Sequence, residues 1–184
     1  LSLIFSATQK PREKEHTGPA THPTTANADR KGGYKWSMPG EAEIYRADGW
    51  KGAVSALPPG GDTNLAQHAI THNDAYDAEC GLSPDGNWVI YCSTLSGDPE
   101  VWAMRSDGSK QVQLTHNQGY DGGPFFSPDG KRICYRSDRK GNGMLQIFVA
   151  DLTFNGAGDI TGIKDETQLT HNAAVNFGPY WHPD

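Results

Sequence analysis

Three histidines occupy the same position of a repeated Thr-His-Asn motif, at His72, His116 and His171. Imidazole nitrogens bind zinc and similar metals, so three equivalent histidines raise the question of a metal site. Ligands must converge to about 2.0–2.1 Å from the metal, whereas loops related by rotation about an axis diverge unless they lie almost on that axis. We therefore favour a structural interpretation, in which the His and Asn side chains bond nearby backbone and fix a crossing between sheets.

Acidic residues follow the first two motifs. Asp77, Glu79 and Asp121 would hold a cation or attract a basic partner segment, or else they form a solvated rim. A second acidic set recurs inside a Ser-Pro-Asp turn, at Asp85, Asp129 and Asp184. Asp is favoured in such turns because it bonds its own backbone. We assign the second set to turn formation and only the first set to binding.

The sequence has no local catalytic motif. It contains no G-x-S-x-G, H-E-x-x-H or P-loop pattern, which are the arrangements that serve a nucleophile, a zinc protease or a phosphate. Cys80, Cys92 and Cys134 are odd in number and form no C-x-x-C pair. They encode no local zinc site or disulfide framework, and pairing between two of them stays open. We predict no catalytic residue, no metal and no cofactor within this chain.

Charge and hydropathy narrow the class of partner. The chain of 184 residues has 16 Lys and Arg against 22 Asp and Glu, with a net charge of −6. No basic run could neutralise a row of phosphates, which argues against nucleic acid. The apolar stretch LSLIFSA is far too short to span a bilayer. The expected partner is a protein or peptide, with no nucleic acid and no membrane span.

The chemical candidates belong to a repeat. THNDAYDAECGLSPDG from Thr71 aligns with THNQGYDGGPFFSPDG from Thr115 and THNAAVNFGPYWHPD from Thr170. Two further columns run LIFSAT, VIYCST, ICYRSD and EIYRADG, EVWAMRSDG, QIFVADL. Each segment is short, β-branched or aromatic and bounded by turn residues, which is typical of strands. Four strands in a period of roughly 40 to 50 residues form the blade of a β-propeller.

The fold class expected is therefore all-β: a partial β-propeller of about three four-stranded antiparallel blades plus the first strand of another, a fragment of a larger ring. We expect a first blade in 1–72 that lacks its inner strand and has a long polar insertion at about 9–34. Blades follow in 73–116 and 117–172, the latter with an insertion between its last two strands, and 173–184 begins another. Such a fragment is marginal unless the remaining blades of the same polypeptide, or another copy, cover its open ends.

Because successive strands run in opposite directions, successive loops lie at opposite ends of the blades, which form the two rims of the propeller. The Thr-His-Asn loops join the outer strand of one blade to the inner strand of the next, so they share a rim with the loops between second and third strands. Inner strands line the channel of a propeller, which places the candidate residues near its mouth. The predicted partner-binding residues are His72, Tyr76, Asp77, Glu79, His116, Tyr120, Asp121 and His171.

The blade columns resemble those of the TolB-type β-propeller family. The match rests on GLSPDGNWVIYCSTLSGDPEVWAMRSDGSKQVQLTHN and PFFSPDGKRICYRSDRKGNGMLQIFVAD, and it extends over nearly all of 34–184. The resemblance implies a six-bladed periplasmic or otherwise envelope-associated propeller without catalytic residues, which binds a lipoprotein and a colicin segment through its mouth. The chain departs from that family in its long 9–34 excursion and its Thr-His-Asn crossings.

Three functions follow from these features. The first is a non-catalytic scaffold whose mouth-side loops bind a protein or peptide in a bacterial envelope. The second is a substrate-gating propeller of a larger hydrolase, of the prolyl-oligopeptidase or zinc aminopeptidase type, with catalytic residues outside this chain. The third is a lyase-type propeller that binds a metal through His72, His116 and His171.

Overall fold

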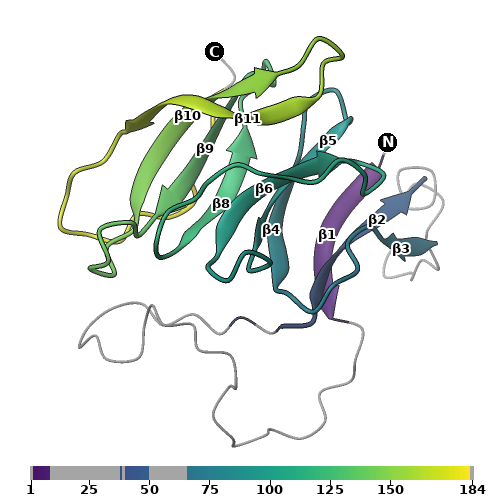
Figure 1. Ribbon diagram of the computed structural model, residues 1–184, viewed down its shortest axis with the longest axis horizontal. Coiled ribbons are helices and arrows are strands. Elements are labelled where there is room, and N and C mark those ends of the chain that lie inside the picture. Colours follow the sequence, from purple (N-terminus) through teal and green to yellow (C-terminus); the bar gives the residue numbers. More distant parts are fainter. Residues whose placement is uncertain (1, 9–37, 39, 50–65, 183–184) are drawn as a thin grey trace, which may run out of the picture.

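A computed structural model describes residues 2–8, 38, 40–49 and 66–182. These residues form β-strands and connecting loops in three antiparallel sheets that stand side by side (Figure 1). The all-β class and the four-stranded antiparallel blades are as predicted. Within the described ranges, no helix is long and apolar enough to cross a membrane.

The strands of each sheet follow one another in chain order. The first sheet has three strands, β1 (Ser2–Thr8), β2 (Ala42–Asp48) and β3 (Gln67–Ala69). The second has β4 (Asp77–Leu82), β5 (Trp88–Ser93), β6 (Glu100–Arg105) and β7 (Val112–Gln113). The third has β8 (Asp121–Phe126), β9 (Arg132–Ser137), β10 (Gln146–Phe154) and β11 (Ile160–Gln168).

Side chains of β5 show why its residues form a buried strand. All six residues are buried, because successive side chains point to opposite faces of the sheet and both faces are covered. Trp88 and Ile90 pack in the cluster shared with the third sheet. Val89 and Tyr91 pack in the cluster shared with the first sheet. The sequence of β5 is therefore a nearly continuous apolar run and does not alternate between apolar and polar residues.

The inner strand of each complete sheet lies against the preceding sheet. The strand β4 packs against β1 and β2, and β8 packs against β4 and β5. Figure 1 shows the same stagger, with β8 between β9 and the second sheet and β4 next to β1. This offset makes the stack a succession of blades, each of which needs its neighbours to bury both faces.

The insertion of the third blade lengthens its outer hairpin. β10 and β11 are each nine residues long, and Phe154 pairs with Ile160 across a turn at 155–159. A tight turn forms there because Asn155 Oδ1 accepts from the backbone N–H groups of Ala157 and Asp159, both at 2.9 Å. Most of the extra residues therefore continue the strands beyond the length of β6 and β7.

Ser-Pro-Asp-Gly forms a hydrogen-bonded turn, as predicted. Ser83 Oγ donates to Asp85 Oδ1 at 2.6 Å and accepts from the backbone N–H of Trp88 at 2.9 Å. Asp85 Oδ1 also accepts from the backbone N–H of Asn87. The same bonds recur around Ser127 and Asp129, and the hydrogen bonds of each serine lower the pKa of its aspartate. The third Asp of this set, Asp184, lies outside the described residues.

The division of the chain at residues 72, 116 and 172 stays a prediction, because strand pairing locates sheets rather than domain limits. The predicted insertion at 9–34 lies outside the described residues. The segment 173–184, predicted to begin another blade, is described to His182 and has no strand conformation there. A strand requires a paired neighbour, and the part of the chain that the structure describes offers this segment none on its free side.

Gly86 closes the first Ser-Pro-Asp-Gly turn with φ +74°, and a Cβ there would meet no atom within 4 Å. Gly86→Ala should therefore lower the free energy of unfolding by about 1 kcal/mol through backbone strain alone. Gly156→Ala is the control, because Gly156 also has open space around it but no positive φ. Urea denaturation of both variants checks the difference; an equal effect at the two sites would contradict it.

Candidate functional site

The Thr-His-Asn crossings lie in contact with the loops that were predicted to share their rim. Tyr76 N–H donates to Thr94 Oγ1 at 2.9 Å, which joins the crossing before β4 to the loop after β5. Asp138 N–H donates to the carbonyl of Tyr120 at 2.8 Å and makes the equivalent connection in the third sheet. The Thr-His-Asn crossings and the β5–β6 and β9–β10 loops therefore form one surface, which we call the crossing rim.

The threonine of each Thr-His-Asn motif anchors the crossing to the next-to-last strand of its own sheet, which is β2, β6 or β10. Thr71 Oγ1 accepts from Ile44 N–H, Thr115 Oγ1 from Val101 N–H and Thr170 Oγ1 from Ile147 N–H, all at 2.8 Å. Thr71 and Thr115 are 0% and 2% exposed. Each hydroxyl thus accepts a hydrogen bond from a backbone N–H of the strand that would otherwise have no partner at the end of the sheet.

The asparagine of each motif reaches forward to the start of the next inner strand. Asn73 Nδ2 donates to Asp77 Oδ2 and Asn117 Nδ2 to Asp121 Oδ2, both at 2.8 Å. In the third copy, Asn172 bonds Asn176 at 3.1 Å. The predicted bonds to nearby backbone are present for Asn73 and Asn172, whose Oδ1 atoms accept from the N–H groups of Ala75 and Ala174, while the contacts to the start of the next inner strand join side chains.

An acid or amide near the start of that same strand, β2, β6 or β10, also holds the crossing. Glu43 Oε1 accepts from Asn73 N–H at 2.8 Å, and Thr115 Oγ1 donates to Glu100 Oε2. Gln146 takes this place in the third sheet, where its Nε2 donates to the carbonyl of Asn172 at 3.2 Å. Burial raises the pKa of Glu100 to about 8, while the Thr115 hydrogen bond opposes that rise.

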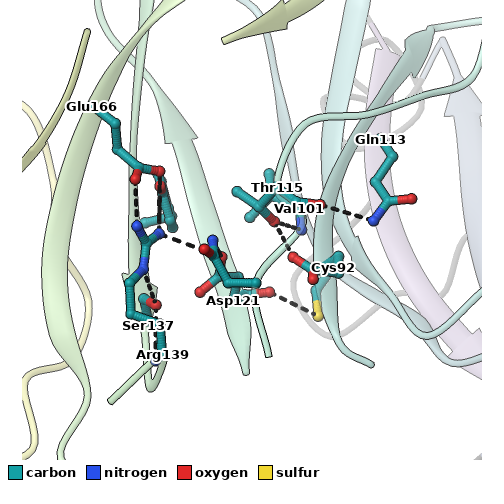
Figure 2. A network of polar contacts seen from close by, with 11 residues as sticks. Cys92, Val101, Gln113, Thr115, Asp121, Ser137, Arg139 and Glu166 are labelled. Atoms are coloured by element: carbon teal, nitrogen blue, oxygen red, sulfur yellow. Dashed lines mark hydrogen bonds and ion pairs between the residues drawn. The ribbon is translucent and has the colours of Figure 1, made fainter. Parts of the chain in front are cut away.

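Two of the predicted mouth acids are buried rather than exposed. Asp77 and Asp121 are 0% and 1% exposed, and burial raises the pKa of both, against the hydrogen bonds that they accept. Figure 2 shows Arg139 between Asp121, at 3.5 Å, and Glu166, to which its guanidinium donates. The charge of Asp121 is thus partly balanced within the fold.

The three histidines point away from this internal network. His72, His116 and His171 are all exposed, although the residues on either side of each are bonded within the fold. Among the described residues, no group of three or more His, Cys, Asp or Glu side chains is arranged to hold a metal ion. The structure therefore brings the three crossings into the same setting without gathering their imidazoles.

Glu79 has an internal role that depends on an unusual backbone. It lies in a β-bulge of β4 with φ +52°, and the equivalent positions in the two later copies are Gly123 and Gly178, with φ +59° and +57°. Its carboxylate accepts from Arg136 Nη2 at 2.6 Å, from Gly123 N–H at 2.9 Å and from the Tyr120 hydroxyl. Glu79 therefore joins the second sheet to the third at the inner strands.

Arg136 and Arg139 were not among the site residues predicted from the sequence. Arg136 is 7% exposed, and its guanidinium also lies 5.5 Å from the centre of the Tyr120 ring. The repeat itself indicates that Glu79 has a special contact. The bulge position, which has a left-handed backbone, is Gly in two copies and Glu in one. A carboxylate in place of a glycine implies a specific partner, and an arginine of the next blade supplies it.

A cavity of about 380 Å³ lies at the opposite end of the sheets. The two Ser-Pro-Asp-Gly turns and the β10–β11 turn line it, with Trp88, Phe126 and Phe154 among its apolar side chains. Arg105 stacks on Trp88 at 4.5 Å and, with Lys110, pairs with Asp159 of the third sheet. The polar groups at this rim thus bond one another across the two sheets.

The three cysteines are free thiols. Cys92 and Cys134 are 0% and 4% exposed, and burial raises the pKa of Cys134 and Cys80 to about 11. These thiols are protonated at neutral pH and act as small apolar side chains.

Comparison with known proteins identifies the repeat. A family model described as the TolB β-propeller domain matches residues 81–164, which hold most of the second and third sheets. This part of the chain is thus similar to a TolB-type β-propeller. A comparison with curated proteins finds no match.

Two solved TolB structures share the fold. A protein from Agrobacterium tumefaciens assigned as TolB is 27% identical, with a TM-score of 0.52 over 77% of this chain and 42% of that protein. TolB from Acinetobacter baumannii is 24% identical, with a TM-score of 0.50 over 73% of this chain and 28% of that protein. The chain therefore spans less than half the length of either protein.

The β4 bulge at Glu79 can be tested with two substitutions at one position. Glu79→Ala removes the acceptor for the buried Arg136 guanidinium and should lower the free energy of unfolding by about 2 kcal/mol. Glu79→Gly removes the same acceptor but relieves the left-handed backbone, so it should be about 1 kcal/mol more stable than Glu79→Ala. Chemical denaturation measures both. Equal stability of the two variants would show that the backbone is not strained.

Glu100 should make stability depend on pH. Its folded-state pKa of about 8 exceeds the ordinary value, so the folded state holds the proton more tightly and stability falls as pH rises from about 4.5 to 8. Glu100→Gln, which places the residue of the third sheet at this position, should reduce that fall by at least about 1 kcal/mol. Urea midpoints at pH 5 and pH 8 test this, and an unchanged difference between them would rule it out.

Proposed function

We propose that this chain is a non-catalytic TolB-like scaffold that binds a protein or peptide through its crossing rim. The observation that carries the proposal is the contrast within each Thr-His-Asn motif. Its Thr and Asn are bonded inside the fold, whereas His72, His116 and His171 are exposed. The motif thus presents a polar aromatic side chain on a backbone that is already fixed.

A fixed backbone favours binding because little conformational entropy is lost when a partner docks. Imidazole donates and accepts hydrogen bonds and also stacks on apolar groups, so three such side chains suit the backbone and side chains of a peptide. Half-buried Tyr76 lies next to the first crossing and adds an aromatic surface. These features support recognition of an extended polypeptide.

The predicted site residues divide into two roles in this proposal. The three histidines and Tyr76 supply contacts to the partner. Asp77, Glu79, Tyr120 and Asp121 hold the crossings in place, which is why their side chains are bonded within the fold. A basic partner segment is not favoured by these acids, because Glu79 and Asp121 already have arginines beside them.

Localisation and the wider context follow from the resemblance to TolB. We place the protein in the bacterial envelope on that ground, with further blades of the same polypeptide as neighbours. The alternative of a substrate-gating propeller in a hydrolase rests on no contact among the described residues. The reading frame around this chain distinguishes the two, since only the alternative requires an adjoining catalytic domain.

A peptide selection tests the proposed surface. Peptides selected from a displayed random library on the immobilised chain should lose at least about tenfold in affinity, or about 1.4 kcal/mol, when His72, His116 and His171 are all changed to Ala. His68→Ala is the control, because His68 is an exposed histidine of β3 outside the crossings. Fluorescence anisotropy measures the affinities, and circular dichroism checks the fold. Unchanged affinity in the triple variant would exclude the histidines as contacts.

A further inference from the structure

The insertion of the third blade builds one wall of the cavity at the rim opposite the crossing rim. The two Ser-Pro-Asp-Gly turns lie side by side there, since a Cβ on Gly130 would be 3.6 Å from Pro84 Cδ. The β10–β11 hairpin, whose outer strand is longer than that of the second sheet, adds Phe154, Ala157 and Ile160 to the lining. The cavity therefore combines two copies of the repeated turn with a hairpin that the insertion lengthens.

Ion pairs hold this hairpin against the second sheet. Arg105 and Lys110 both donate to the carboxylate of Asp159, whose side chain is 9% exposed. The hydrogen bonds from Lys110 and Arg105 lower the pKa of Asp159 to about 2, so its charge is present at neutral pH. Because Asn155 closes the hairpin turn itself, this wall is formed before a ligand enters, and a preformed site loses little conformational entropy on binding.

The apolar part of the lining runs from the space between the sheets out to solvent. Trp88 and Ile160 are each 4% exposed, Phe126 is half-buried and Phe154 is 44% exposed. The guanidinium of Arg105 lies 4.5 Å from the centre of the Trp88 ring, so a cation already rests on an aromatic face here. The cavity volume of about 380 Å³ is near the lower end of the range of about 300–1,000 Å³ for small-molecule sites. A single aromatic ring with a short chain is therefore a suitable size.

The carboxylates of Asp85 and Asp129 determine the charge of the cavity. Each accepts hydrogen bonds from the serine of its own turn and from the backbone N–H two residues later. The serine bond lowers the pKa of each aspartate, so both are ionised at neutral pH, and both are exposed. Arg105, the cation of the described lining, is paired with Asp159. The lining thus keeps an excess of negative charge, which favours a cationic ligand over an anionic one.

We propose that this cavity binds a small organic cation, in which an ammonium group is carried on an apolar body the size of one aromatic ring. The ring packs against Phe126 and Phe154, and the ammonium group bonds the carboxylates of Asp85 and Asp129. Burial of the ring supplies affinity, and charge-assisted hydrogen bonds fix its orientation.

The location of the lining favours a small molecule over a peptide. The lining residues belong to turns and to the ends of strands, so they offer a peptide backbone no strand edge with which to pair. The cavity lies at the rim opposite the crossing rim, and the proposal does not depend on the function proposed for that rim.

Two ligands of opposite charge test the proposed ligand class. 2-Phenylethylammonium and 3-phenylpropanoate both carry one ring on a short chain, but the first is a cation and the second an anion at neutral pH. Isothermal titration calorimetry on the full chain should give a Kd of about 1 mM or tighter for the ammonium ligand, as expected for a ligand of so few atoms. The carboxylate ligand should bind at least about tenfold more weakly because two carboxylates repel it. Equal affinities, or no binding of the ammonium ligand at millimolar concentration, would overturn the proposal.

Substitutions in the lining locate the bound ligand. In Asp129→Asn the amide oxygen accepts the same turn bonds from Ser127 and Lys131, while the lost charge should weaken 2-phenylethylammonium binding at least about fivefold. Asp107→Asn is the matched control, because Asp107 is also an exposed turn aspartate bonded to a serine, Ser109, and lies outside the lining.

The aromatic wall is tested in the same titration. Phe154→Ala removes an exposed ring of the lining and should weaken binding of the ammonium ligand by a similar factor of about five. Leu95→Ala is its control, because Leu95 is 48% exposed and lies in the β5–β6 loop at the crossing rim. Circular dichroism checks the fold of each variant. Unchanged affinity in either Asp129→Asn or Phe154→Ala would place the ligand elsewhere and contradict the proposal.

Discussion

The structure depends on the way each chain crossing from an outer strand to the next inner strand satisfies its polar groups. A Thr hydroxyl accepts a hydrogen bond from a strand N–H, and an Asn amide donates to the start of the next inner strand. An acid or amide of the next-to-last strand of the sheet also bonds the loop. Because buried backbone groups must be paired, these bonds determine where each inner strand begins. The bonds recur at all three crossings, so successive sheets are stacked with the same offset. Apolar packing between the sheets follows from that offset.

This constraint also explains why Thr and Asn of the Thr-His-Asn motif bond within the fold while its His is exposed. Thr and Asn are short, and their polar atoms lie close enough to the backbone to bond it. The histidine between them therefore points outward, into solvent. The acids that follow are drawn inward by the same bonds, and Asp77 and Asp121 are buried with raised pKa values as a result. The acidic residues that were expected at a binding rim thus bond within the fold, and the exposed side chains of the motif are the imidazoles.

Most of the fold could be predicted from local sequence patterns. The strand columns, the Ser-Pro-Asp-Gly turns and the rim assignment follow from residue period and turn chemistry, which act over a few positions. Burial of Asp77 and Asp121 did not follow, because it depends on how closely one sheet approaches the next. The pairing of Glu79 with Arg136 joins residues far apart in sequence, and the β10–β11 extension depends on a turn at Asn155. The Glu79–Arg136 pair joins two periods, and the Asn155 turn lies in an insertion of the third blade.

Departures from the repeat are the most informative positions of such a chain. A position that is Gly in two copies and Glu in the other identifies a bulge that all copies need and a contact that one copy adds. Glu79 adopts a backbone conformation that favours glycine, and the bonds to Arg136, Tyr120 and Gly123 offset that strain. Glu100 of the second sheet and Gln146 of the third occupy equivalent positions. A titrating carboxyl group at one crossing thus corresponds to a neutral amide at the next. In a repeat protein each sheet contacts only its neighbours, so substitutions of this kind give each interface its own stability while the common bonds keep the geometry equal.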